Sequence, residues 1–246
     1  MEVVHSGDIP ARSGVGSSSS FTVGMIKSIA AIQKIEMPKS ELAQLALHVE
    51  QTLVGEVVGS QDQIAATYGG LNGIEFGRTF EDEFEVLPIP RSSQLALDLE
   101  AWMLLCFTGI SRNASAIAEE KVKRFGGKAA ELREIEAIAR EGFDILLKGS
   151  GSIEELGKLL DLQWSVKRSL APVISNSVID DLYHSGKKAG ALGAKLLGAG
   201  GGGFILFLAP PQHHNRIKQA LNTCLFLDAK FDSAGSSIIF DEDNDV

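Results

Sequence analysis

The spacing of apolar residues predicts a helix near the start of the chain, over residues 21–34 ("FTVGMIKSIAAIQK"). Apolar side chains recur there at helical intervals, and further apolar residues fill the opposite face, so we expect the helix to be buried on nearly all sides. An extended run that begins at Val3 and Val4 precedes it. Pro10 ends that run, because proline cannot donate to a strand ladder.

A second helix is expected to begin at Ser40, which is a good N-cap residue. Its apolar stripe comprises Leu42, Leu45, Ala46, Val49 and Leu53. Glu50 lies at the edge of this stripe, so its carboxylate is expected to reach an interior cavity and not open water. Further along, Asp62 opens a short helical turn that a pair of glycines ends, and a strand is expected over residues 71–77.

The remaining sequence predicts strands separated by amphipathic helices. The helices are expected over residues 111–125, 128–149, 152–170, 177–190 and 211–222, and the strands over 102–109, 204–210 and 231–240, the last as part of a hairpin. Ser152 followed by Glu155 is a capping box, which marks the start of one of these helices. We therefore predict an α+β protein whose two lobes, residues 1–95 and 96–246, meet at a cleft.

The composition is that of a globular protein, with 44% hydrophobic and 22% charged residues among 246. A formal net charge of −9 without a basic cluster argues against nucleic acid or an anionic membrane as the main partner. No apolar run is long enough to span a membrane and no signal peptide is recognisable, so we expect a cytoplasmic protein. Cys106 and Cys224 both lie in apolar stretches and are expected to be buried free thiols.

Glycine is concentrated in two stretches, "SGVGSSSSF" at residues 13–21 and "GALGAKLLGAGGGGF" at residues 190–204. The first lacks the third glycine of a dinucleotide-binding fingerprint and the lysine of a P-loop. Its glycines still let the backbone approach a ligand, and its serines lead into a helix N-terminus, where unpaired N–H groups favour an anion. By itself the pattern leaves open a phosphate-binding loop and a turn that only caps the helix. Taken alone, Asp62 could serve only as the N-cap of a helix and bind no ligand. Glu50 alone could equally be a half-exposed helix residue with no ligand.

Three segments taken together resemble motifs of the GHMP small-molecule kinases, the family of galactokinase, homoserine kinase, mevalonate kinase and phosphomevalonate kinase. "PARSGVGSSSSFTVGMI" (10–26) resembles the second motif of the family, and "KLLGAGGGGF" (195–204) resembles the third. "VEQTLVGEVVGSQDQIAATYGG" (49–70) resembles the segment that carries a metal-binding glutamate and a catalytic aspartate. "FTGISRNAS" (107–115) and the stretch at 190–204 look closest to the heptose-phosphate kinase branch.

The resemblance covers nearly all of the chain and implies a two-lobed GHMP kinase fold. Its N-terminal lobe would be ribosomal protein S5 domain 2-like, and its C-terminal lobe would be a ferredoxin-like α/β plait. The first motif of the family should precede residue 1, so the resemblance also implies an N-terminal lobe that is incomplete. The basic residue that usually accompanies the catalytic aspartate, and several contacts to the nucleotide base, would be missing with it.

The resemblance also implies a site for ATP and Mg²⁺. The phosphates would be wrapped by Gly14, Val15, Gly16, Ser17, Ser18, Ser19 and Ser20, and this loop would be supported by Gly200, Gly201, Gly202 and Gly203. Glu50 and Ser18 would hold Mg²⁺, and the serines on either side of Ser18 are the alternatives. Tyr68 and Gly69 would lie near the sugar, and we add Arg112 as a contact to the sugar or to a substrate phosphate.

Asp62 would face the hydroxyl that is phosphorylated, either as a base or as an orienting acceptor. The expected function is therefore an ATP-dependent sugar kinase that acts on the anomeric C1 hydroxyl of D-glycero-D-manno-heptose 7-phosphate. Two alternatives stay open: a related kinase for galactose or fucose, and a non-catalytic truncated remnant that binds ligands as a regulator. The expected partner is a small sugar or sugar phosphate, and a homodimer is left open.

Overall fold

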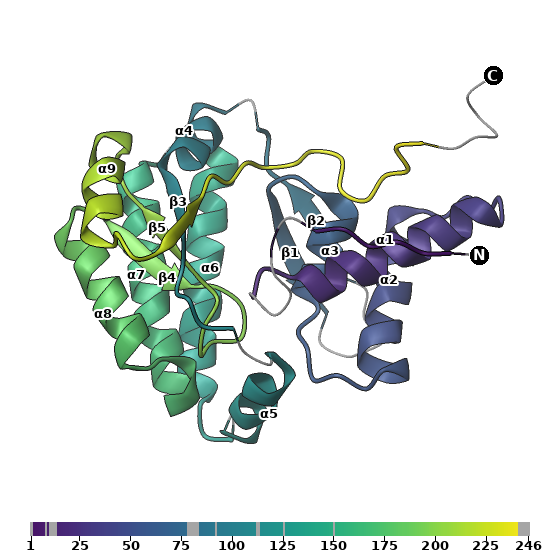
Figure 1. Cartoon of the computed structure of the whole chain (residues 1–246), viewed down its shortest axis with the longest axis horizontal. Coiled ribbons are helices and arrows are strands. Elements are labelled where there is room, and N and C mark those ends of the chain that lie inside the picture. The colour runs from purple at the N-terminus through teal and green to yellow at the C-terminus, as the bar shows by residue number, and fades with distance from the viewer. Residues whose placement is uncertain are drawn as a thin grey trace. The chain divides into compact units, whose positions relative to one another are not determined.

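The computed structural model describes residues 2–7, 9, 14–77, 84–91, 93–111, 114–124, 126–149 and 151–240. The chain divides into two compact units (Figure 1). The first comprises Met1–Ala11, Gly16–Pro88 and Phe231–Val246, and the second comprises Arg12–Val15 and Ile89–Lys230. The main boundary between the units lies at Pro88/Ile89. The return of the last segment to the first unit had no signal in the sequence.

The first unit combines packed helices with a two-stranded hairpin. Its elements are α1 (Ser17–Ile32), α2 (Lys39–His48) continued by a π-helical turn (Val49–Leu53), α3 (Gln61–Tyr68), β1 (Asn72–Phe76) and β2 (Phe84–Pro88), with the two strands antiparallel. Val23 of α1 packs against Leu42 and Ala46 of α2 in a small core. Helix α1 begins earlier than predicted, because Gly16 turns the chain in the left-handed conformation and the serines after it are already helical.

Helix α1 is not buried on nearly all sides, and that prediction was wrong. Val23 and Ala30 are buried, but Phe21 is 41% exposed and Ile32 is 65% exposed. The reason is that α1 packs on α2 and α3 along one flank, while its other flank lines a groove together with residues 2–5. Residues 2–7 belong to no strand in the described chain.

The second unit is built on a four-stranded antiparallel sheet. Its elements in chain order are α4 (Gln94–Trp102), β3 (Met103–Phe107), α5 (Ala114–Arg124), α6 (Ala129–Lys148), α7 (Ile153–Leu170), a 3₁₀ turn (Pro172–Ile174), α8 (Ser177–Lys188), β4 (Gly193–Leu196), β5 (Phe204–Leu208), α9 (Pro211–Ala220) and β6 (Leu225–Leu227). The strand order is β4-β5-β3-β6. With helices between β3 and β4 and between β5 and β6, this is the ferredoxin-like plait that was predicted.

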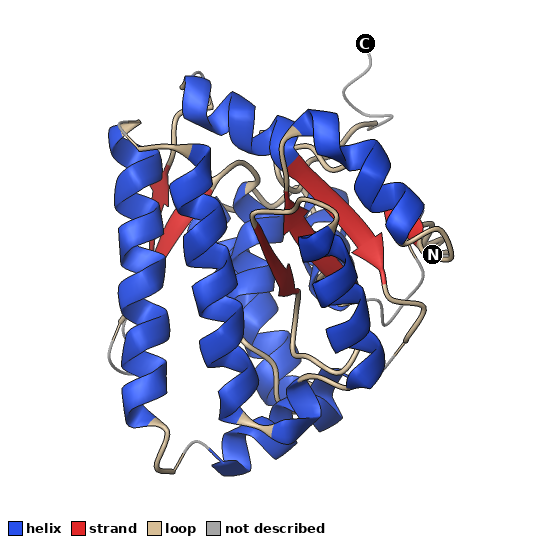
Figure 2. Cartoon of the chain, turned by 90° about the vertical axis from the view of Figure 1, so that its left-hand side faces the viewer, coloured by secondary structure: helices blue, strands red, loops and turns tan. Residues whose placement is uncertain are grey.

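Helices cover the sheet of the second unit (Figure 2), and one face of the sheet carries the core of this unit. Because side chains alternate along a strand, every second residue points to that face. The residues concerned are Leu104 and Cys106 of β3, Ala194 and Leu196 of β4, and Ile205 and Phe207 of β5. They share the core with Trp164 of α7, Ile179 of α8 and Ile217 of α9, so these helices are anchored to the sheet.

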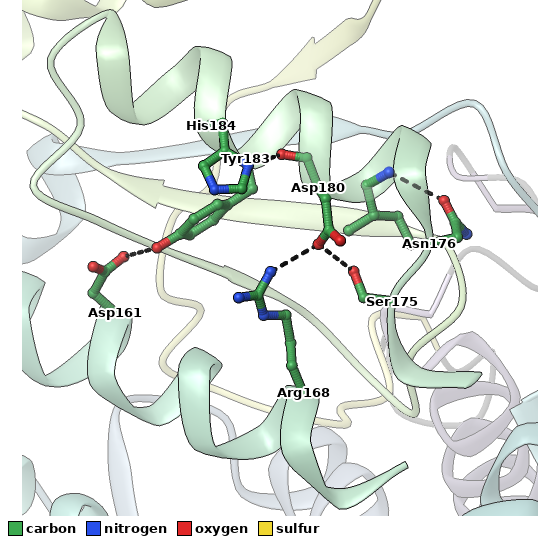
Figure 3. Close-up of polar contacts among 8 residues, drawn as sticks. Asp161, Arg168, Ser175, Asn176, Asp180, Tyr183 and His184 are labelled. Atoms are coloured by element: carbon green, nitrogen blue, oxygen red, sulfur yellow. Dashed lines mark hydrogen bonds and ion pairs between the residues drawn. The ribbon is translucent and has the colours of Figure 1, made fainter. Parts of the chain in front are cut away.

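Polar contacts fix α8 against α7 (Figure 3). Arg168 Nη1 lies 2.9 Å from Asp180 Oδ1, and the Ser175 hydroxyl donates to the same oxygen at 2.7 Å. One helical turn away, the Tyr183 hydroxyl donates to Asp161 Oδ1 at 2.7 Å. Asn176 caps α8 by accepting a hydrogen bond from a backbone amide of its first turn. The start of α8 is therefore held in one place.

Three parts of the sequence prediction for residues 94–246 differ from the structure. Residues 231–240, all of which are described, contain no strand, and the last strand of the sheet, at its edge beside β3, is β6. Strand β4 lies inside the glycine-rich stretch, where a side chain at Gly193 would overlap the backbone of Gly157. Helix α4 was missed, because its apolar positions span little more than two turns.

Gly186 offers a test of the packing of α8 on the sheet. A Cβ at this position would overlap the ring of Phe207, whereas a Cβ at Gly142, inside α6, would meet only ordinary contacts of 3.9 Å. We expect Gly186→Ala to lower the free energy of unfolding by about 1–3 kcal/mol, because it overpacks the core. Gly142→Ala is the matched control and should raise it by up to about 1 kcal/mol. Urea unfolding checks both values, and equal effects would contradict the packing.

Cys106 is buried and Cys224 is partly exposed, and both are free thiols. Across the described ranges, no helix is long and apolar enough to cross a membrane. The cytoplasmic location expected from the sequence stays a prediction.

Candidate active site

Glu50 is the centre of a buried polar cluster in the first unit. Its side chain is only 4% exposed, and both carboxylate oxygens accept hydrogen bonds. The Ser19 hydroxyl donates to Oε2 at 3.0 Å, and the Thr22 hydroxyl donates to Oε1 at 2.9 Å. The Gln63 amide nitrogen also donates to Oε2. Helices α1 and α3 thus both supply donors to one carboxylate.

Local sequence explains why these groups converge. Ser19 and Thr22 are three residues apart on α1, so they lie on the same face of that helix. Glu50 lies in the π-helical turn after α2, where the Val54 amide donates to the Val49 carbonyl at 2.8 Å. A π turn shifts the helical register, and such turns are common at functional sites. Here the shift accompanies a glutamate that is buried, and not half-exposed as the helical pattern alone allowed.

Asp62 lies beside this cluster in the first turn of α3. A Cβ added to Gly16 would come within 3.3 Å of the Asp62 side chain, so the glycine–serine loop passes directly over this carboxyl. Burial raises the pKa of Asp62 above its ordinary value of 3.8. A hydrogen bond from Gln61 opposes the rise, and the negative charge of Glu50 adds to it. Asp62 therefore accepts a proton more readily than an exposed aspartate.

The raised pKa of Asp62 predicts a pH-dependent effect on stability in the metal-free protein. The folded chain holds the Asp62 proton more tightly than the unfolded chain, so this carboxyl contributes stability below 3.8. That contribution is lost as the pH rises through the raised pKa of Asp62 in the folded chain. Asp62→Asn removes the titration, so its stability relative to wild type should be higher at about pH 7 than at about pH 4. Urea unfolding at both pH values checks this, and an unchanged difference would show that Asp62 is not desolvated.

The N-terminus of α1 has the features of an anion site. Gly16 precedes it with φ +72, no side chain caps it, and its first turn contains no acidic residue. The first amides of the helix are therefore left without helical acceptors, and the helix dipole favours negative charge there. Gly16, the first turn of α1, Glu50 and Asp62 lie within one unit, so this helix end and the two carboxylates form a continuous candidate site.

The cluster fits a divalent cation. Glu50 meets only neutral donors, and it forms no ion pair within the described part of the chain. A buried carboxylate without a cationic partner is costly, and bound Mg²⁺ relieves that cost. Among the described residues no group of three or more His, Cys, Asp or Glu could hold a metal. Few protein ligands are typical of Mg²⁺ that is shared with phosphates.

The residues assigned to the sugar lie at the C-terminal end of α3, under the last segment of the chain. Lys39 Nζ donates to the carbonyls of Tyr68 and Ala234, at 3.0 and 2.9 Å. A side chain at Gly69 would overlap Gly235, which itself leaves no room for a side chain. Burial raises the pKa of Tyr68. Residues 232–235 therefore hold this end of α3 in place.

The second glycine stretch is rigidly supported within the second unit. Lys167 Nζ donates to the carbonyls of Leu196 and Gly198, at 3.1 and 2.7 Å. The Thr108 hydroxyl donates to the Gly203 carbonyl at 2.8 Å. Gly200, at φ +117, passes so close to Ile174 that a Cβ would lie 2.8 Å from its Cα. Residues 200–203 thus form a fixed loop that only glycine can build.

The structure brings together Ser19, Glu50 and Asp62, whereas Ser18 is exposed and the serine that hydrogen-bonds Glu50 is Ser19. Thr22 and Gln63 were missed, although a hydroxyl three residues after Ser19 on an apolar helix is a signal that could have found Thr22. Gly200–Gly203 belong to the other unit. Arg112 lies outside the described residues.

These features define a two-unit α+β protein in which a glycine–serine loop opens a helix beside two carboxylates. Comparison with known proteins is more specific. Residues 1–70 match the family model of the GHMP kinases N-terminal domain, and residues 135–225 match that of the GHMP kinases C-terminal domain. The chain belongs to the GHMP kinase family and has its fold.

Relatives of the chain include sugar kinases. It is 34% identical to the D-glycero-alpha-D-manno-heptose 7-phosphate kinase of Campylobacter jejuni, over 86% of this chain and 62% of that protein. It is 25% identical to the galactokinase of Pyrococcus furiosus, over 87% of this chain and 66% of that protein. A solved D-glycero-D-manno-heptose 1-phosphate kinase from Bacteroides thetaiotaomicron aligns with TM-score 0.67 and 26% identity, over 93% of this chain and 64% of that one. The chain thus spans less than two thirds of each relative.

Proposed function

We propose that this chain is an ATP-dependent sugar kinase whose substrate is a heptose phosphate. The observation that carries the proposal is the buried Glu50, held by Ser19 and Gln63, directly beside Asp62 and the glycine–serine loop. The proposal of a heptose phosphate as substrate rests on the similarity to the Campylobacter enzyme and on the segments at 107–115 and 190–204.

In this proposal the loop of residues 14–20 binds the ATP phosphates through its backbone amides, and Glu50 and Ser19 hold Mg²⁺. Ser19 takes the place first assigned to Ser18, because Ser19 is the serine that contacts Glu50. Bound Mg²⁺ supplies neutralisation of the charge on the phosphates. Tyr68 and Gly69 contribute to the sugar pocket.

Asp62 has the chemistry of the proton acceptor. As the sugar hydroxyl oxygen bonds to the γ-phosphorus and ADP leaves, the hydroxyl proton passes to the Asp62 carboxylate. The raised pKa of Asp62 suits this task, since a stronger base takes the proton earlier. We propose the anomeric C1 hydroxyl as the acceptor.

A substrate panel tests the function. The full chain is incubated with ATP, Mg²⁺ and D-glycero-D-manno-heptose 7-phosphate, galactose, fucose or mevalonate, and ADP release is measured. Turnover with the heptose phosphate, and phosphate on C1 by phosphorus NMR, is the expected result. Turnover with galactose or fucose instead would reassign the substrate. Binding of ATP and sugar without turnover would favour a ligand-binding regulator. Sedimentation of the same sample decides whether the chain is a homodimer.

A further inference from the structure

Gln63 is a buried side chain whose hydrogen bonding is only half satisfied. It is 0% exposed, and its amide nitrogen donates to Glu50 Oε2. Its amide oxygen is buried and has no hydrogen-bond partner. In the described chain the only other such side-chain atom is Trp164 Nε1, which belongs to the second unit. Unpaired buried acceptors are rare because their desolvation is not compensated. The missing hydrogen-bond partner of the Gln63 oxygen therefore requires an explanation.

The charge of Glu50 dictates which way the Gln63 amide faces. A carboxylate is an acceptor only, so the amide must present its nitrogen to Glu50. Turning the amide round would place two acceptor oxygens against each other. The oxygen of Gln63 is therefore directed away from Oε2 by the same interaction that holds Glu50 in place.

The hydrogen bonds leave little freedom to Glu50. Oε2 accepts from Ser19 and Gln63, and Oε1 accepts from Thr22. A carboxylate has roughly four lone-pair positions, so one remains open, on Oε1. Ser19 donates its proton to Glu50, which keeps the lone pairs of its own oxygen available. Oxygen lone pairs at Glu50, Ser19 and Gln63 are thus left over in one buried cluster.

We propose that Gln63 is part of the cation site: its nitrogen orients Glu50, and its oxygen is offered to the divalent cation, directly or through a bound water. This inference rests on the proposed function, which supplies the cation. Amide oxygens are among the hard ligands that Mg²⁺ accepts, and the groups that orient a metal ligand commonly set metal affinity. Gln63 is a positioning residue in this scheme, and Asp62 keeps the chemistry.

The experiment measures how strongly Mg²⁺ promotes nucleotide binding. Calorimetry gives the affinity for the imidodiphosphate analogue of ATP, with Mg²⁺ and with EDTA. We expect Gln63→Met to reduce the Mg²⁺-dependent gain in affinity by about 10- to 100-fold, while binding in EDTA is unchanged. Thr67→Val is the matched control, because Thr67 is equally buried on α3 but bonds only to the carbonyl of Gln63. The Mg²⁺-dependent gain in nucleotide affinity of Thr67→Val should equal that of wild type.

A second variant distinguishes a ligand from a packing residue. Gln63→Glu keeps an oxygen and adds a charge next to Glu50, so its melting temperature should fall in EDTA and rise with Mg²⁺ by more than that of wild type. The inference would be overturned if Mg²⁺ increased the nucleotide affinity of wild type and of Gln63→Met equally, or if Mg²⁺ did not raise the melting temperature of Gln63→Glu by more than that of wild type. Either result would leave the proposed function standing. If wild type itself binds the analogue equally well with Mg²⁺ and with EDTA, the cation site of the proposed function fails too.

Discussion

Asp62→Asn is expected to lower the rate of phosphoryl transfer by about 10²- to 10⁴-fold, the usual range for a general base. Asparagine has the size of aspartate and fits beside Gly16, but it cannot take a proton. The ground state should be affected much less, because in the proposed function the loop amides bind the nucleotide and Glu50 binds the cation, and both remain. We therefore expect the loss in kcat, with the affinity for the ATP analogue close to that of wild type. Steady-state kinetics and calorimetry measure the two quantities.

Asp181→Asn is the control for this change, since Asp181 is an exposed aspartate on α8. It should turn over like wild type. Turnover of Asp62→Asn near the wild-type rate would show that Asp62 is not the proton acceptor. It would not contradict the proposed roles of the phosphate loop and of the cluster around Glu50.

Glu50→Gln is expected to weaken the response to Mg²⁺ by more than about 100-fold, beyond the effect of losing a group that only orients a ligand. The amide keeps the shape of the side chain but has no charge to offer a cation. The fold should survive, because the hydroxyls of Ser19 and Thr22 can accept as well as donate, and Gln63 can turn its oxygen toward the new amide. A Mg²⁺ titration of the rate measures the first effect, and the melting temperature in EDTA measures the second.

Glu56→Gln makes the same chemical change on an exposed glutamate of the neighbouring loop and should leave both quantities unchanged. An identical Mg²⁺ half-saturation in Glu50→Gln and wild type would show that Glu50 is a structural residue. A collapse of the melting temperature in EDTA would show that its charge holds the helices together without a cation.

The sequence predicted best those elements whose pattern is local. The capping box at Ser152 marks a helix that the structure confirms, because it involves only residues close together in the sequence. Strand β4 was not predicted, since its one glycine, Gly193, is required by contact with Gly157 of α7, a partner distant in sequence. The strand expected over 231–240 was wrong for a similar reason, since alternation alone does not supply a pairing partner.

The candidate site shows the same limit. Glu50 and Asp62 were assigned through motif resemblance, and the structure places both beside the loop. Which serine faces Glu50 depends on how Gly16 rotates the start of α1, and no pattern of four serines reveals that rotation. Gln63 was missed because its burial results from the packing of three helices, and its neighbour Asp62 explained the motif without it.

The docking of residues 232–235 on α3 has a consequence for biosynthesis. The first unit is completed by a segment that leaves the ribosome only after the entire second unit has been made. Until then, Lys39 lacks one of its two carbonyl acceptors, and the backbone of Gly69 lacks the glycine packed against it. Domains usually fold as units during synthesis, N-terminal first. Here the end of α3 must wait, so residues 68–70 reach their final packing last.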